Sequence, residues 1–131
     1  MQITLRVPAS APANQTADFL REVELSGFNG VGVTDSQLLM RDVYVTLGLA
    51  AQKTSKLTLC TAVTNPVTRH ISVLASAIQT VEELAPGRVK IILGSGYSSV
   101  NTIGQRPATL SKMRECVITL KKLLAGESVS I

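Results

Sequence analysis

The chain has few aromatic side chains: two Phe, two Tyr and no Trp among 131 residues. Proteins that bind nucleic acid commonly stack bases on such rings, so this composition argues against that class of partner. The chain also has only two Cys and one His, and none of them has a partner at metal-ligand spacing. No apolar run approaches the roughly 20 residues needed to cross a bilayer. We therefore expect no nucleic-acid, metal or membrane site.

The remaining composition is that of a packed domain, with 45% hydrophobic and 17% charged residues and a formal charge of +4. This balance excludes a disordered segment, and the length suits a single domain over residues 1–131. The scattered positive charge favours an anionic small molecule only weakly. Met1–Val7 enters a strand directly without a secretory pattern, so we expect a cytoplasmic protein. Cys60 and Cys116 stand alone in apolar stretches and are predicted to pack in the core.

The most informative stretch runs from Leu57 to His70. Residues 57–63 are small, β-branched or apolar, which is typical of a strand buried on both faces of a parallel sheet. A turn at Asn65-Pro66 follows, and it delivers Asn65, Arg69 and His70 just past the strand. Ligands of β/α proteins bind at that end of the strands. The polar cluster is therefore a candidate ligand site, and an ordinary strand-to-helix loop is the alternative.

The rest of the sequence repeats this alternation of strand and helix roughly every 30 residues. Predicted strands cover residues 3–7, 31–35, 57–63 and 88–93. The first three predicted helices run from Ala17, behind a Thr16 cap, to Gly27, from Asp42 to Thr54, and from about Ser72 to near Pro86. A fourth predicted helix ends at Gly126. Its apolar stripe is expected to pack on the sheet and consists of Leu110, Met113, Val117, Leu120 and Leu124.

Two α/β architectures fit such a repeat. Parallel strands in sequential order make a half barrel, four β/α units of a TIM-barrel-like (β/α)8 fold, whereas a reversal of strand order makes an open doubly wound sheet. The dinucleotide fingerprint that would favour the second is absent, because Gly94-Ser95-Gly96 lacks a third glycine at the required offset. A Rossmann-like nucleotide binder is accordingly the third-ranked reading.

An ordered set of motifs extends over nearly the whole chain: Gly27-Phe-Asn29, Val33-Thr-Asp35, the run from Thr61 to His70, Leu84-Ala-Pro-Gly-Arg88, Leu93-Gly-Ser-Gly96 and the segment from Ser98 to Ala108. Together they resemble the bacterial luciferase-like oxidoreductases, and most closely the branch that uses flavin or coenzyme F-420 and includes methylenetetrahydromethanopterin reductases. The Val-Thr-Asn-Pro-x-Thr-Arg-His run, residues 63–70, is the most specific part.

The resemblance implies a (β/α)8 barrel that holds FMN or the deazaflavin F-420 at the C-terminal ends of its strands, for hydride transfer or monooxygenation of a small-molecule substrate. In the reductase branch a non-prolyl cis peptide bulges from the third strand and supports the ring, and the motif places it at Ala62-Val63. The other positions that match the ring pocket are Asp35, Asn65 and the turn Gly94-Ser95-Gly96.

Three departures from the family pattern stand out. Many members carry a His or Glu beside the strand-two aspartate to move protons, and this chain has Ser36. Close relatives carry an acidic residue directly after the Gly-x-Gly turn, and this chain has Tyr97. A whole barrel takes about 250 residues, and the family's cofactor phosphate site lies on later units. The short form is therefore also compatible with binding no cofactor.

Two residues of the central run have alternative roles. Arg69 either faces an anionic cofactor or substrate, or pairs with Asp35 or Glu82. His70, the single histidine, is a candidate catalytic residue for proton transfer, although a lone loop histidine more often contacts backbone or caps the next helix.

Four barrel strands leave two unpaired edges, so we expect a homodimer or higher homo-oligomer formed through them. The alternative to an oxidoreductase, or a fragment of one, is a non-catalytic half barrel that binds a small molecule or self-associates.

Overall fold

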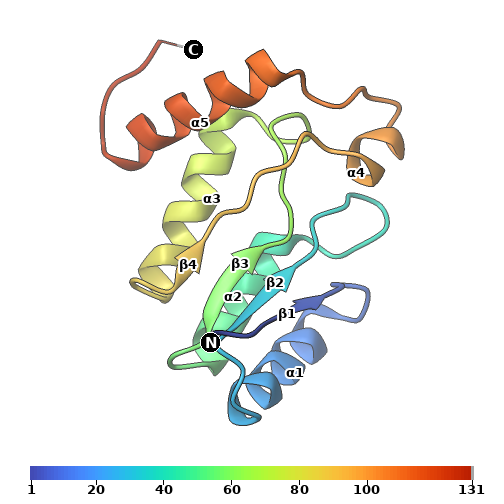
Figure 1. The fold of residues 1–131 in the computed structure, drawn as a ribbon, viewed down its shortest axis with the longest axis vertical. Helices are drawn as coiled ribbons and strands as arrows, with labels where there is room; N and C mark the ends of the chain where they lie inside the picture. Colours follow the sequence, from blue (N-terminus) through green and yellow to red (C-terminus); the bar gives the residue numbers. More distant parts are fainter. Residues whose placement is uncertain (131) are drawn as a thin grey trace.

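The computed structural model describes residues 1–130, in which strands and helices alternate along the chain (Figure 1). The strands pair in parallel in the order β1-β2-β3-β4, which confirms the sequential arrangement of a half barrel and rules out the doubly wound sheet. Among these residues no helix has the length and apolarity to span a bilayer. The elements are β1 Thr4–Val7, α1 Ala13–Leu25, β2 Gly30–Val33, α2 Val43–Lys53, β3 Thr58–Thr61, α3 Ile71–Leu84, β4 Val89–Lys90, α4 Ser98–Asn101 and α5 Leu110–Leu124.

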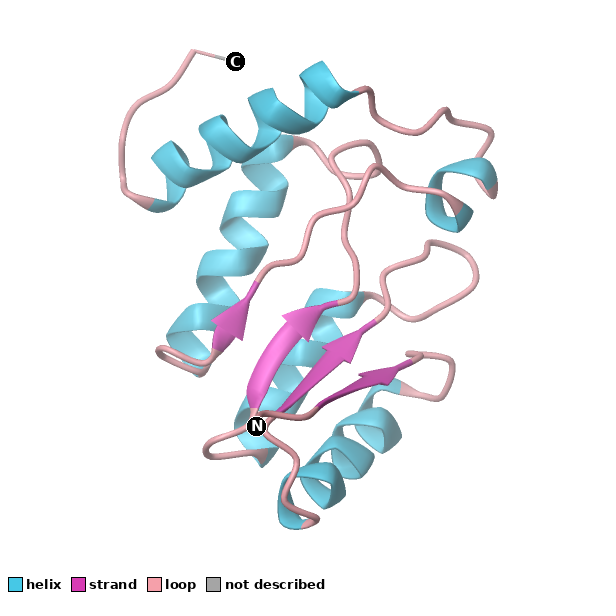
Figure 2. Cartoon of the chain, in the orientation of Figure 1, coloured by secondary structure: helices cyan, strands magenta, loops and turns pink. Residues whose placement is uncertain are grey.

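The hydrophobic core lies between the sheet and the helices α1, α2 and α3, which cover one face of it (Figure 2). Successive side chains of a strand point to opposite faces, so every second strand residue enters this layer. The helices contribute apolar residues at helical spacing. Its members include Val7, Val31, Val33 and Leu59 from the strands and Leu20, Leu47, Leu74 and Ile78 from the helices.

The other face of the sheet has a different composition. It carries small and polar residues, namely Thr4, Arg6, Gly30, Gly32, Thr58, Cys60 and Lys90. Within residues 1–130 no helix packs on this face. Cys116 belongs to the core cluster as predicted, whereas Cys60 is buried on this second face. Burial raises the pKa of both thiols, so both stay protonated at neutral pH.

Two helices begin earlier than the sequence predicts. Helix α1 starts at Ala13 rather than Ala17, because Pro12 supplies a fixed φ of −49° and lacks the N–H that a first turn leaves unpaired. The Thr16 N–H already bonds to the Pro12 carbonyl, so the predicted Thr16 cap is wrong. Helix α3 starts at Ile71, and its cap is His70 rather than Ser72: the imidazole accepts a hydrogen bond from the Ser72 N–H.

Strand β4 is shorter than predicted, with two residues instead of six. Beyond Lys90 the Thr61 hydroxyl bonds to both the N–H and the carbonyl of Ile92, at 3.0 Å each, and so replaces the backbone ladder. Pairing resumes at a single bridge between Thr64 and Leu93. The Ala62–Val63 peptide in between is cis, as the family resemblance implies.

The predicted packing of the last helix is wrong. Helix α5 packs against α3 and against no strand, lying across the end of α3 in Figure 1. Of its predicted stripe, Leu110 is 86% exposed and Leu120 is buried, and Cys116 is the other buried residue. Helix α5 does not reach the sheet because of the segment from Gly94 to Thr109, which contains α4. This segment carries the chain across the C-terminal ends of the strands and away from the helical layer.

Two charged side chains fix the N-terminal ends of the strands. The Glu24 carboxylate accepts hydrogen bonds from the backbone N–H groups of Ser55, Lys56 and Leu57. Burial alone would raise the pKa of Glu24, but these donors and the Arg88 guanidinium outweigh it and hold the pKa below its usual 4.5. Arg88 itself donates to the carbonyls of Ala51, Thr54 and Leu57, so it closes the C-terminus of α2.

The first prediction concerns Glu24. Because its pKa is lowered on folding, its contribution to stability is complete above about pH 4.5 and is lost as pH falls through the folded-state pKa. We expect Glu24→Gln to lower the free energy of unfolding by about 2 kcal/mol at pH 7, and the deficit to shrink toward about pH 3.5. Urea unfolding at both pH values measures it. The exposed neighbour variant Glu22→Gln should change stability by less than about 0.5 kcal/mol; an equal effect of the two would contradict this role.

Candidate functional site

An open pocket of ≈ 570 Å³ lies beyond the C-terminal ends of the strands. Segments after β2, β3 and β4 form it together with α4, and Arg6 of β1 reaches it from the sheet edge. The sheet order brings these segments together, since the ends of parallel strands meet at one edge. Of the residues that the sequence singles out, those lining the pocket are Asp35, Ala62, Val63, Gly94, Ser95 and Gly96.

Part of the pocket surface depends on glycine. A Cβ on Gly94 would lie 2.7 Å from the Cγ2 of Val63, and one on Gly96 would lie 2.7 Å from the Cγ1 of Val100. Gly96 also has a φ of +86°, which disfavours any side chain. The chain after β4 therefore lies directly against Val63, leaving a surface of backbone and small side chains beside the pocket.

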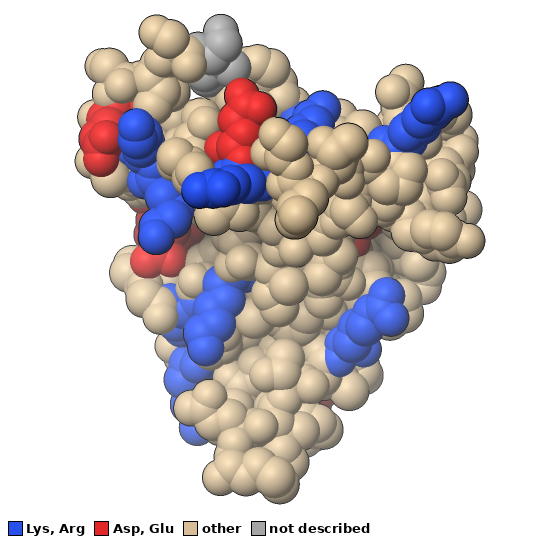
Figure 3. Space-filling view, turned by 45° about the horizontal axis from the view of Figure 1, so that its top comes forward, with Lys and Arg blue, Asp and Glu red and all other residues tan. Residues whose placement is uncertain are grey.

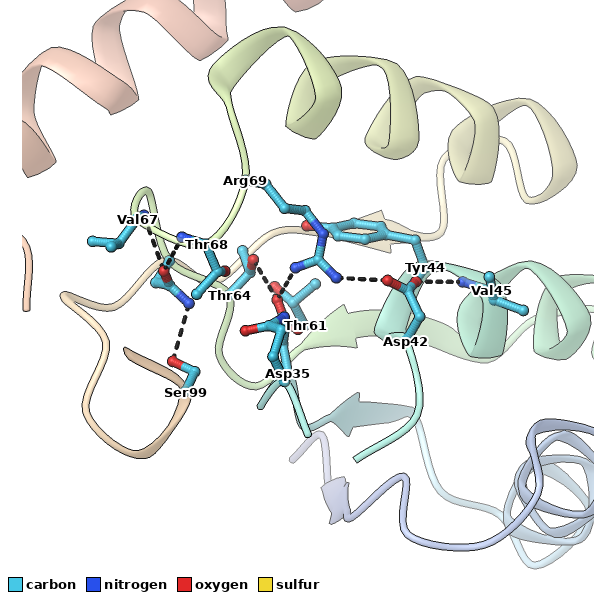
Figure 4. A network of polar contacts seen from close by, with 12 residues as sticks. Asp35, Asp42, Tyr44, Val45, Thr61, Thr64, Val67, Thr68, Arg69 and Ser99 are labelled. Atoms are coloured by element: carbon cyan, nitrogen blue, oxygen red, sulfur yellow. Dashed lines mark hydrogen bonds and ion pairs between the residues drawn. The ribbon is translucent and has the colours of Figure 1, made fainter. Parts of the chain in front are cut away.

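Asp35 reaches the pocket from the end of β2, and its carboxylate is fully engaged (Figure 4). Its Oδ2 accepts from the Thr64 hydroxyl at 2.8 Å and from Nη1 of Arg69 at 2.6 Å. Its Oδ1 accepts from Nε2 of Gln37 at 2.7 Å. The side chain is 1% exposed, so its negative charge is compensated inside the protein rather than by solvent.

Arg69 connects three segments of the structure. It pairs with Asp35, as one of its predicted alternatives stated, and its Nη2 also bonds to Oδ2 of Asp42 at 2.7 Å (Figure 4). Burial alone would lower the pKa of Arg69, but the two carboxylates raise it. The guanidinium also lies 5.0 Å from the ring centroid of Tyr44, a cation–π contact. Burial raises the pKa of Tyr44 to about 12, so this phenol keeps its proton.

Asn65 lies behind the pocket and is 1% exposed. Its Oδ1 accepts from the N–H groups of Val67 and Thr68, an Asx turn that shapes the loop after β3. Its Nδ2 donates to the Ser99 hydroxyl at 3.1 Å, which ties this loop to α4 (Figure 4). Asn65 thus positions two segments that border the pocket.

His70 faces a different space. It is exposed, caps α3, and places Nδ1 2.8 Å from the Ser72 hydroxyl. It borders a second pocket of ≈ 400 Å³ between this loop and α5, together with Lys112 and Cys116. Arg69 borders that second pocket as well. The structure therefore does not bring His70 into the pocket that Asp35 lines.

Sequence reasoning missed several residues of the site. Thr64 and Gln37 bond to Asp35, and Ser99 to Asn65, yet no pattern marks them as polar partners. Arg6 was detectable: in Ile3–Val7 the apolar Leu5 and Val7 alternate with Thr4 and Arg6, which predicts Arg6 on the face away from the helices.

The match to known proteins agrees with this geometry. The family model for luciferase-like monooxygenases matches residues 2–131. The chain belongs to the luciferase-like monooxygenase family.

Individual proteins resemble this chain in sequence or in fold. The 5,10-methylenetetrahydromethanopterin reductase of Methanolobus tindarius is 34% identical over 126 residues, which are 93% of this chain and 38% of that protein. The coenzyme F-420-dependent tetrahydromethanopterin reductase of Methanopyrus kandleri superposes with a TM-score of 0.83 at 23% identity, over 92% of this chain and 39% of that one. A type II Baeyer–Villiger monooxygenase of Pseudomonas putida, in complex with FMN, gives a TM-score of 0.78 at 17% identity, over 94% and 39%. The chain spans less than half the length of each.

The second prediction concerns the Arg69 cluster of this luciferase-like protein. Arg69→Met leaves the Asp35 charge buried without its partner, so we expect the free energy of unfolding to fall by about 3 kcal/mol. Asp42 is half-exposed, and Asp42→Asn keeps an oxygen to cap α2, so this control should cost less than about 1 kcal/mol. Adding Asp35→Asn to Arg69→Met should recover part of the loss in a double-mutant cycle. Additive losses would contradict the buried ion pair.

Proposed function

We propose that this chain binds the ring of FMN or of coenzyme F-420 in the ≈ 570 Å³ pocket at the strand ends, as part of an oxidoreductase. The observation that carries the proposal is the convergence there of Asp35, Ala62-Val63 and Gly94-Ser95-Gly96 from three separate segments. Membership of a family that contains F-420-dependent and FMN-bound proteins supports it.

The residues present fit a flat heterocyclic ring. Gly94 and Gly96 leave a surface without side chains, and Val63 is 42% exposed beside it, so a planar apolar group can lie against this part of the pocket. Polar groups stand at its border: the hydroxyls of Ser36 and Ser98 are 3.2 Å apart and can each bond to a ring substituent. Apolar surface with a few placed polar groups is typical of cofactor sites.

The roles of the chain's own residues follow from their contacts. Ala62, Val63 and the turn Gly94–Gly96 would support the ring, and Asp35 would offer Oδ1 to a hydrogen-bond donor of the ring. Asp35 keeps its position because Arg69 and Thr64 hold Oδ2, while Oδ1 has the exchangeable partner Gln37. Asn65 would not contact the ring. It would position α4 and the loop after β3, which border the pocket. The cofactor, when bound, supplies hydride transfer or oxygen chemistry, and the protein supplies orientation and electrostatics.

The third prediction tests the ring site. We expect FMN or F-420 to bind with a change in fluorescence, and Gly94→Ala to weaken binding about tenfold or more, because its Cβ would displace Val63. Gly48→Ala is the matched control: its Cβ would lie at an ordinary 3.6 Å from Leu84 and far from the pocket, so affinity should not change. Absence of saturable binding of either cofactor to the wild type would refute the proposal.

We propose in addition that copies of the chain associate through the sheet edges. β1 pairs only with β2 and β4 only with β3, so each leaves one row of backbone donors and acceptors without a partner strand among the described residues. Such edges favour pairing with another strand. Exposed Ile92 lies beside the β4 edge and adds apolar surface.

The fourth prediction follows from those edges. Size-exclusion chromatography with light scattering at micromolar concentration should give at least twice the 13.9 kDa mass of the chain. The Lys90 N–H lies on the side of β4 that pairs with β3, so the Val89 N–H points to the free edge. Val89→Pro removes that edge N–H and should shift the protein toward the monomer, whereas Lys121→Gln, on α5, should not. A folded monomer for the wild type would contradict self-association.

A further inference from the structure

Arg6 is the charged residue of the pocket that the proposed function leaves without a role. It stands on β1 between Leu5 and Val7, which face the helical layer, so its own side chain lies on the opposite face. Its partner in register on β2 is Gly32, so no charged side chain stands opposite it on that strand. The guanidinium is exposed and borders the same pocket as Asp35.

The two charged residues that line this pocket differ in their surroundings. Asp35 is buried and bonded to Arg69, which also pairs with Asp42, while the Arg6 side chain forms no ion pair or hydrogen bond with any of residues 1–130. Lys90 lies in the same register layer, on the same face, and is exposed. Basic side chains outnumber acidic ones over the face shown in the space-filling view (Figure 3). The exposed and unpaired Arg6 guanidinium therefore places a positive charge at the β1 side of the pocket, which favours a negatively charged ligand there.

We propose that Arg6 binds an anionic group, a carboxylate, phosphate or sulfonate, of the substrate; this deepens the proposed function and rests on it. The planar guanidinium matches such groups with two parallel hydrogen bonds. β1 and β4 are opposite edges of the sheet, roughly 14 Å apart at the usual strand spacing. A ring held at the turn Gly94–Gly96 thus leaves the β1 side of the pocket to a second molecule, with its anion at Arg6.

The fifth prediction uses two fluorescent probes that differ in charge. Anilinonaphthalenesulfonate is anionic, and N-phenyl-1-naphthylamine has the same rings without the sulfonate. We expect Arg6→Gln to weaken binding of the first about fivefold at low salt and to change the second less than about twofold. Arg21→Gln, an exposed arginine on α1, is the matched control and should change neither. Inorganic phosphate should displace the sulfonate from the wild type. Equal affinities of the wild type and Arg6→Gln for the anionic probe would overturn the inference.

A second experiment tests whether the anion that Arg6 binds belongs to the substrate or is the phosphate of the cofactor. Riboflavin and FMN share their ring and differ by the phosphate. If Arg6 serves the substrate, Arg6→Gln leaves the affinity ratio of FMN to riboflavin unchanged; a selective loss of FMN affinity would assign Arg6 to the cofactor and overturn the proposal. If no flavin or F-420 binds while the probes still discriminate at Arg6, the ring site fails and the anion preference of Arg6 stands.

Discussion

The buried ion pair between Arg69 and Asp35 is the interaction on which the site depends. It joins the end of β2 to the loop after β3, and the second bond of Arg69, to Asp42, adds the start of α2. The loop after β3 thus meets two segments about 30 residues earlier in the chain at one guanidinium, over the ring of Tyr44. A buried charge is favourable only when it is paired with an opposite charge. The ion pair therefore restricts the geometry of the strand ends.

The one-sided core explains why that restriction matters. Large aliphatic side chains fill the layer between sheet and helices, whereas the second face has glycine at two successive inward positions of β2, Gly30 and Gly32. Cβ atoms there would contact Thr58 and Ala62 at 3.2 Å or less. Large side chains are therefore excluded from that face of β2, and polar contacts such as those of Asp35 and Asn65 connect the segments beyond the strand ends.

The motif run from Thr61 to His70 carries the family resemblance, and that resemblance implied both the sequential strand order and the position of the cis peptide. Hydrophobic periodicity is a local signal: it placed strands and helices along the chain but left two strand orders open. The sequence was insufficient where the same local pattern fits two arrangements that differ only in their tertiary contacts. The stripe on α5 has helical spacing, yet the path of the chain through α4 decides that it meets α3 instead of the sheet. Likewise, no pattern reveals that the Thr61 hydroxyl replaces the ladder of β4, since this needs both strands in place.

Glu24 and Asp35 occupy opposite ends of the same strands, and this separation has an evolutionary consequence. The backbone amides before β3 are fixed from the far end, without help from any residue that borders the cavity. Residues at the mouth, such as Ser36 and Tyr97, take no part in holding these amides, so substitutions there leave the start of β3 in place. A fold built this way can change its chemistry through substitutions at the pocket end alone.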